Sequence, residues 1–68
     1  MVDGKKIKAL RETAGLTGEQ LGNDIGISQS MIAHIERGFK QPNIETLARM
    51  ANVFGVTVDE LLKKPIRR

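Results

Sequence analysis

The amino-acid sequence predicts an all-α domain, a bundle of five short helices. Apolar residues recur at spacings of three and four over most of the chain. In addition, five residues of the kinds that cap helices each stand directly before one of these patterns. A sustained alternation of apolar and polar residues, which a half-buried strand would show, is missing. The segment 53–58, VFGVTV, is a less favoured candidate strand.

The first helix is predicted over residues 4–14, GKKIKALRETA. Asp3 precedes it, and its carboxylate can accept a hydrogen bond from a free backbone N–H of the first turn. Gly15 is expected to end the helix. Apolar residues recur on one side at helical spacing: Ile7, Leu10 and Ala14. The lysines of this segment are interpreted as a solvated face: Lys5, Lys6 and Lys8.

The second and third helices are predicted to form a tight corner. Thr17 and Gln20 make a capping box, T-x-x-Q, which opens a helix over 18–25. Ser28 caps the third helix, which is expected to end at Gly38. Only three residues, 26–28, separate the two helices, and so short a turn favours a steep crossing. Positive φ at the first of them, Gly26, would suit this corner, so the spacing is that of a helix-turn-helix.

The last two predicted helices follow the loop FKQPN. Asn43 caps the fourth, and Gly55 is expected to end it. Its apolar face contains Ile44, Leu47, Ala48 and Ala51. Thr57 and Glu60 form a second capping box, T-x-x-E, that opens a short fifth helix holding Leu61 and Leu62. The domain is predicted over residues 1–64, and residues 65–68 form a basic C-terminal tail.

Composition narrows the classes of function. The chain has 68 residues, a formal net charge of +3 and no cysteine, which excludes disulfides and thiolate metal sites. No apolar run approaches the roughly 18 residues needed to span a bilayer, so a cytoplasmic protein is expected. The basic balance favours a polyanionic partner. A single histidine, with no paired carboxylates or nucleophile beside it, gives no indication of an enzyme, a metal site or another cofactor.

The predicted third helix has two unlike sides. At about 100° per residue, Met31, Ile32 and Ile35 share the side that would pack on the domain. The opposite side carries amide, hydroxyl, imidazole and guanidinium groups around a small residue: Gln29, Ser30, Ala33, His34 and Arg37. Such groups suit base edges and phosphates, so this helix could lie in a major groove.

With these helices the sequence resembles a known family, the Cro/C1-type (XRE-like) helix-turn-helix domain of phage repressors and small bacterial regulators. The resemblance covers residues 7–62 through the stretches LRETAGLT, LTGEQLGNDIGISQSMIAHIERG and LARMANVFGVTVDELL. It implies a lambda-repressor-like fold and base contacts from Gln29, Ser30 and His34. It also implies phosphate contacts, which come from Thr17, Gly18, Arg37, Gly38, Phe39 through its N–H, Lys40 and Gln41.

The resemblance further implies an ion pair between Arg11 and Glu36 that ties the first helix to the end of the third. Two positions depart from the family pattern. Gly18 stands where a bracing glutamine is common, and Gly22 stands where alanine is usual. Glycine keeps the second position small but is expected to weaken the helix by roughly 1 kcal/mol relative to alanine.

The sequence therefore predicts a sequence-specific, double-stranded DNA-binding transcriptional regulator, expected to be a repressor, encoded by a bacterium or phage. It is expected to bind a two-fold operator as a homodimer, with no small-molecule ligand and no contact with a membrane. The expected dimer interface comprises Val53, Phe54, Val56, Val58 and Leu61. The alternative is an antitoxin-like module that uses the same helical fold to bind another protein.

Overall fold

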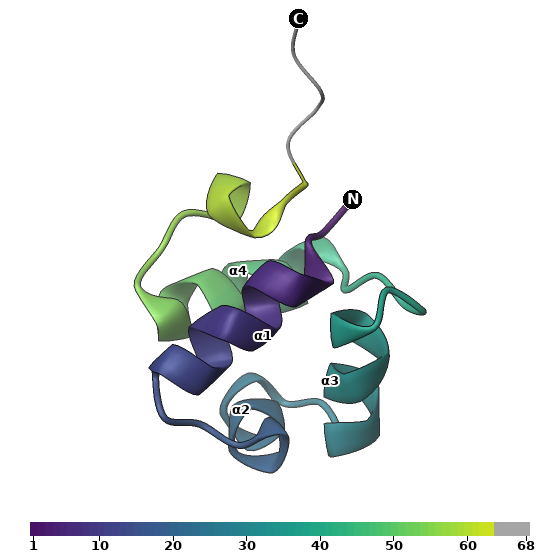
Figure 1. The fold of residues 1–68 in the computed structure, drawn as a ribbon, viewed down its shortest axis with the longest axis vertical. Coiled ribbons are helices and arrows are strands. Elements are labelled where there is room, and N and C mark those ends of the chain that lie inside the picture. The colour runs from purple at the N-terminus through teal and green to yellow at the C-terminus, as the bar shows by residue number, and fades with distance from the viewer. Residues whose placement is uncertain (64–68) are drawn as a thin grey trace, which may run out of the picture.

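The computed structural model describes residues 1–63, which form four α-helices and one turn of 3-10 helix (Figure 1). The all-α class predicted from the sequence is confirmed. The elements are α1 (Gly4–Thr13), α2 (Gly18–Ile25), α3 (Gln29–Glu36), α4 (Ile44–Phe54) and η1 (Val58–Leu61). Residue 64 of the predicted domain and the predicted basic tail at 65–68 lie outside the described residues.

All five predicted capping residues occupy the position before a helix and accept a backbone N–H three residues further on. They are Asp3, Thr17, Ser28, Asn43 and Thr57. At the start of α2 the capping box is complete, because Gln20 N–H donates to Thr17 Oγ1 at 3.0 Å and Thr17 N–H donates to Gln20 Oε1 at 2.9 Å. Local capping chemistry therefore sets where each helix begins.

The predicted fifth helix is not confirmed as an α-helix. Thr57 caps a single 3-10 turn, and the chain leaves helical geometry at Leu62, whose φ and ψ are −97° and 148°. The reason is a long-range pairing, in which Leu62 forms an isolated antiparallel bridge with Val2. These backbone bonds compete with further helical turns, and a four-residue segment gains too little helical hydrogen bonding to resist them.

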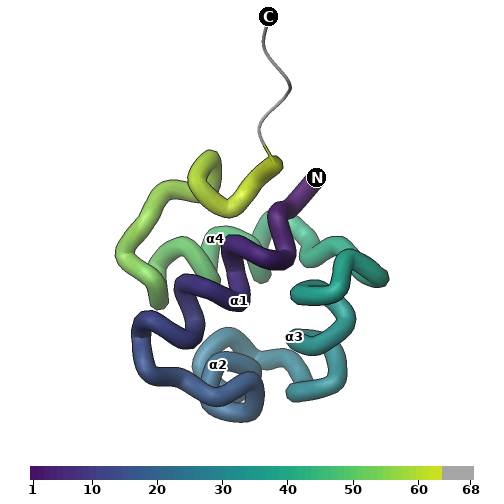
Figure 2. Tube along the Cα trace, in the orientation of Figure 1, coloured from purple at the N-terminus to yellow at the C-terminus, as the bar shows by residue number. Residues whose placement is uncertain are grey.

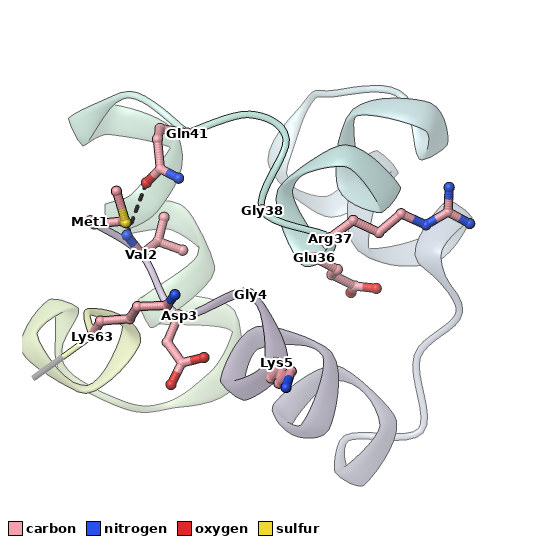
Figure 3. Close-up of a pocket in the computed structure, with 10 residues that line it drawn as sticks. All are labelled: Met1, Val2, Asp3, Gly4, Lys5, Glu36, Arg37, Gly38, Gln41 and Lys63. Atoms are coloured by element: carbon pink, nitrogen blue, oxygen red, sulfur yellow. Dashed lines mark hydrogen bonds between the residues drawn. The ribbon is translucent and has the colours of Figure 1, made fainter.

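We call residues 1–3 and 61–63 the terminal clip. Asp3 N–H donates to Leu61 O at 2.8 Å, and Lys63 N–H donates to Met1 O at 2.9 Å. Figure 2 shows the first residues of the chain running beside the segment that follows η1. A third bond joins the clip to the loop after α3, because Val2 N–H donates to Gln41 Oε1 at 2.9 Å (Figure 3).

The core is built from the apolar sides of all five elements. Its buried members are Val2, Ile7, Leu21, Ile25, Ile32, Ile35, Leu47, Met50, Ala51 and Leu61. Val2 enters the core through the terminal clip and belongs to no helical pattern. Ile44 was expected on the buried face of α4 but is 82% exposed, because the buried stripe begins one turn later at Leu47.

The crossing of α1 and α3 is unusually close. Gly4 is buried, and a Cβ atom built on it would lie 2.6 Å from Ile35 O and nearer still to Glu36 O. Both contacts are with backbone atoms, so any side chain at this position would force the helices apart. None of the helices within residues 1–63 has the length and apolar character that a membrane-spanning segment requires.

Candidate nucleic-acid interface

The corner between α2 and α3 is held by glycines. Gly26 ends α2 with a left-handed backbone (φ 81°), which residues with a Cβ adopt only at a cost. The N–H groups of Gly26 and Ile27 donate to Gly22 O at 2.8 and 2.9 Å. A Cβ on Gly22 would lie 2.5 Å from Ile27 O, so the turn folds back directly over this glycine.

A methyl group at position 22 would therefore meet the turn, whatever the advantage of alanine in helix propensity. Gly18, on the same helix, differs, because a Cβ there would meet only Gln29 Cγ and Ile32 Cγ2, at 3.6 and 3.7 Å. These are ordinary van der Waals contacts. A Cβ atom at position 18 therefore finds room beside Gln29.

Alanine substitutions at Gly18 and Gly22 are expected to change stability in opposite directions. Gly22→Ala should lower the free energy of unfolding by about 1–3 kcal/mol through overpacking against the turn. Gly18→Ala should raise it by about 0.5–1 kcal/mol, because a helical glycine without steric conflict is replaced by a better helix former. Chemical denaturation of the two variants measures both values. Equal effects would contradict the close approach at Gly22.

The two sides of α3 separate as the sequence predicts. Ile32 and Ile35 are 1% exposed and pack the helix against α2 and α1. The residues expected to read bases are all exposed: Gln29, Ser30 and His34. In Figure 1, α2 and the start of α3 lie at the end of the domain away from the N-terminus and η1. The apolar side of α3 is thus packed against the domain, and its polar side is open to solvent.

The backbone N–H groups that follow α3 already donate to carbonyl groups of that helix. Gly38 has a φ of 84°, and its N–H donates to Ile35 O at 3.1 Å. Phe39 and Lys40 N–H both donate to His34 O, at 2.8 and 3.3 Å. The expected phosphate contacts through the backbone of Gly38 and Phe39 are therefore not available in this structure. Phosphate contacts from this segment depend instead on the side chains of Arg37 and Lys40, which are exposed.

Two contacts of the segment after α3 were not predicted from the sequence. The Phe39 ring is 70% exposed and its centroid lies 6.1 Å from that of His34, with the planes tilted by 43°. Gln41 accepts the Val2 N–H, so its oxygen is engaged in the terminal clip and its amide nitrogen is the group that could donate to a phosphate. Neither contact has a sequence signal, because both depend on how the loop folds back.

The start of α2 offers few groups to a phosphate. Thr17 is exposed, but its N–H is already bonded to Gln20 in the capping box. Its hydroxyl and the backbone of the half-buried Gly18 remain as candidate contacts. The next residue is Glu19, whose carboxylate stands in the first turn and opposes an anion there. This end of the interface is therefore less basic than the end of α3.

The predicted ion pair between α1 and α3 is present. Arg11 Nε donates to Glu36 Oε2 at 2.7 Å and Nη2 donates to Oε1 at 3.2 Å, while Nη1 donates to Leu16 O at 2.9 Å. The hydrogen bond to Glu36 raises the pKa of Arg11, and burial offsets part of that rise. The side chains are 14% and 9% exposed, so the pair clamps the end of α3 from inside the domain.

The region expected to form a dimer interface is partly internal. Leu61 has no exposed surface and belongs to the core, so its assignment to an interface is wrong. Three other members are half-buried and pack against that core: Phe54, Val56 and Val58. Val53 is 37% exposed. These four residues keep some surface near the end of α4.

A helix-turn-helix whose second helix exposes a polar side is the arrangement found in one class of helical DNA-binding domains. A family model described as Helix-turn-helix (HTH_3) matches residues 7–61 of this chain. The chain therefore belongs to this Cro/C1-type family of helix-turn-helix regulators, and the resemblance inferred from the sequence is confirmed. The family consists of DNA-binding regulators and not of enzymes.

Curated relatives and a solved structure agree with this assignment. The chain is 31% identical over 61 residues to the HTH-type transcriptional regulator ImmR of Bacillus subtilis, a match that covers 90% of this chain and 48% of ImmR. It is 36% identical to the uncharacterized HTH-type transcriptional regulator YazB of the same species, covering 85% of this chain and 84% of YazB. The P22 c2 repressor in complex with a synthetic operator has a TM-score of 0.87 and 30% identity, covering 93% and 96% of the two chains.

The chain thus spans about half of ImmR, and it spans 19% of the next two curated relatives that it matches. The residues that the family model matches, 7–61, include both helices of the corner and α4. What is shared with the longer relatives is therefore the helix-turn-helix domain described above.

Proposed function

We propose that this domain is a sequence-specific regulator of transcription that binds double-stranded DNA and represses by occupying its operator. The observation that carries the proposal is the geometry of α3. Its buried side is fixed by Ile32 and Ile35 and its end is clamped through Glu36, while its polar side is open to solvent. A helix held in this way can present side chains to a groove without rearranging.

Base reading is assigned to Gln29, Ser30 and His34. A glutamine amide can bond N6 and N7 of an adenine together, which makes Gln29 the strongest candidate for discrimination. The imidazole and hydroxyl of the other two residues can bond base edges directly or through water. Phosphate contacts that fix the register are assigned to five residues: Thr17, Gly18, Arg37, Lys40 and Gln41. These contacts support affinity but read no sequence.

Two copies of the domain are proposed to bind a two-fold operator together. Half-sites one helical turn apart, about 34 Å, would place two recognition helices in successive major grooves on one face of the duplex. The surface near the end of α4 is the proposed interface, formed by Val53, Phe54, Val56 and Val58. Selection from a random duplex library would report the half-site sequence and spacing together.

Alanine substitutions at Gln29 and Lys40 distinguish base reading from phosphate binding. Gln29→Ala should cost about 1–3 kcal/mol of binding free energy on the selected site and little on random duplex, because it removes a base contact. Lys40→Ala should weaken binding to both duplexes about equally, because a phosphate is present in every sequence. Fluorescence anisotropy with both duplexes at fixed salt gives these values.

Two outcomes would count against the proposal. Equal losses for Gln29→Ala on both duplexes would remove the base-reading assignment. No binding of the unmodified protein to any duplex, even at low salt where phosphate contacts are strongest, would overturn the regulator function as a whole. The domain would then have to act through another protein.

A further inference from the structure

We propose that Lys5 and Lys8 of α1 join Arg37 to form a phosphate-binding site for the DNA backbone at the edge of the recognition face. The inference rests on the proposed function and adds to it two residues of α1, which sequence analysis interpreted as a solvated face. It gives the interface a second anchor beside the C-terminal half of α3, whereas the start of α2 lies beside its N-terminal half.

The site is a cavity between α1 and α3. Its volume is about 290 Å³, and its lining comprises Lys5, Lys8, Arg11, Ala33, Glu36 and Arg37. Ala33 and Arg37 belong to the same outward side of α3 as the residues that are proposed to read bases. The small Ala33 side chain leaves the hollow open beside them. The cavity therefore borders the surface on which DNA would lie.

The residues that line this cavity carry an excess of positive charge. Glu36 is its one carboxylate and is already paired with Arg11 at 2.7 Å, so these two charges compensate each other. Lys5, Lys8 and Arg37 are exposed, and neither ion pair found within residues 1–63 involves them. The lining consequently carries a net charge of +3 at neutral pH. Three clustered cations repel one another, and a shared anion would relieve that repulsion.

A neighbouring cavity extends the basic strip toward the terminal clip. It has a volume of about 310 Å³ and shares Lys5, Glu36 and Arg37 with the first. It adds Lys63 and one further carboxylate, Asp3, which is engaged as the cap of α1. In Figure 3 the Arg37 side chain points away from the Val2–Gln41 hydrogen bond. Its guanidinium is thus free of the clip.

The phosphate of a DNA strand fits this strip better than other anions of similar charge. The strip runs along the edge of α3, as a strand would when the helix lies in a groove, and a backbone offers a phosphate at every nucleotide. The start of α2, by contrast, presents Thr17, Gly18 and Glu19 and no cation. Besides Lys40 in the loop after α3, the proposed cationic contacts to the backbone therefore come from the cavity between α1 and α3.

The helix also contains a matched control. Lys5 and Lys8 are three residues apart and so lie within about 60° of each other around α1. Lys6 is about 100° from Lys5 and about 160° from Lys8, and it lies outside the linings of both cavities. It is exposed like the other two. Replacing Lys6 changes the net charge equally but leaves the proposed site intact.

The test measures the salt dependence of binding to the selected duplex for Lys5→Gln, Lys8→Gln and Lys6→Gln. Each of the first two variants should reduce the slope of log affinity against log salt concentration by about 0.9, the value for one lost phosphate contact. A slope change of this size corresponds to about a tenfold loss of affinity at 0.1 M salt, on selected and random duplex alike. Lys6→Gln should leave the slope within about 0.2 of that of the unmodified protein.

Ethylation of single phosphates in the duplex gives a second readout. One flanking phosphate should interfere with binding of the unmodified protein and of Lys6→Gln, but not of Lys5→Gln or Lys8→Gln. Equal slope changes for all three variants would overturn the site, because they would reflect net charge alone. If the unmodified protein binds no duplex at low salt, the proposed function fails, and this site fails with it. Binding with an unchanged slope in the Lys5 and Lys8 variants refutes this inference alone.

Discussion

Glu36→Ala is expected to lower the free energy of unfolding by about 3 kcal/mol. The substitution leaves Arg11 without its carboxylate while its side chain is 14% exposed, and an unpaired charge in such a position is costly. We take the lower end of the range for a broken buried pair, since some solvent reaches the guanidinium and Leu16 O still accepts one of its bonds. A domain of this size has about 3–10 kcal/mol in total, so a large part of its stability would be lost.

Glu45→Ala is the matched control for this substitution. Glu45 pairs with Arg49 at 2.8 Å, nearly the same distance, but the two side chains are 74% and 54% exposed. Exposed pairs of this kind contribute little, so the loss should stay below about 1 kcal/mol, including the favourable charge in the first turn of α4. Urea denaturation of both variants checks the contrast. Similar losses would mean that burial of the Arg11–Glu36 pair has no energetic consequence.

Gly4→Ala is expected to cost about 3 kcal/mol, the upper end of the range for overpacking. The new methyl group would enter the space occupied by the carbonyl groups of Ile35 and Glu36, and backbone atoms cannot rotate away as a side chain can. The N-terminal turn of α1 would have to move off α3. That movement would also strain the terminal clip, whose first segment ends at the preceding residue, Asp3.

Thermal unfolding followed by circular dichroism measures this effect, with Lys5→Ala as the control. Lys5 is the next residue of α1 and is exposed, so its replacement should change stability by no more than about 0.5 kcal/mol. A Gly4→Ala variant as stable as Lys5→Ala would show that α1 can shift on α3 without cost. The close crossing would then contribute nothing to the fold.

Most of the fold could be predicted because it is encoded locally. Each helix begins at a capping side chain three residues from the N–H that it accepts, and Gly26 and Gly38 mark where α2 and α3 end. Such signals lie within a few residues of one another in the sequence. The separation of α3 into a buried and an exposed side follows equally from its spacing, which is why its exposed polar residues could be named in advance.

The features that could not be predicted depend on contacts outside the local helical pattern. The predicted fifth helix is limited to one 3-10 turn, after which Leu62 pairs with Val2, and Leu61 lies in the core. The close approach of Ile27 O to Gly22 depends on the path of the turn after α2, which helix propensity does not describe. The three lysines of α1 are all exposed, and only the position of α3 places Lys5 and Lys8, but not Lys6, at the cavity.

The terminal clip has a consequence for how the domain fluctuates. The clip joins residues about 60 positions apart, such as Val2 and Leu62, so it closes a long loop and carries a large entropic cost for few bonds. The corner between α2 and α3 closes a loop of only a few residues, so its entropic cost is smaller. We therefore expect the clip to form last during folding and to open first in the native state. Because Gln41 is bonded to Val2, each opening also releases the segment that follows the recognition helix.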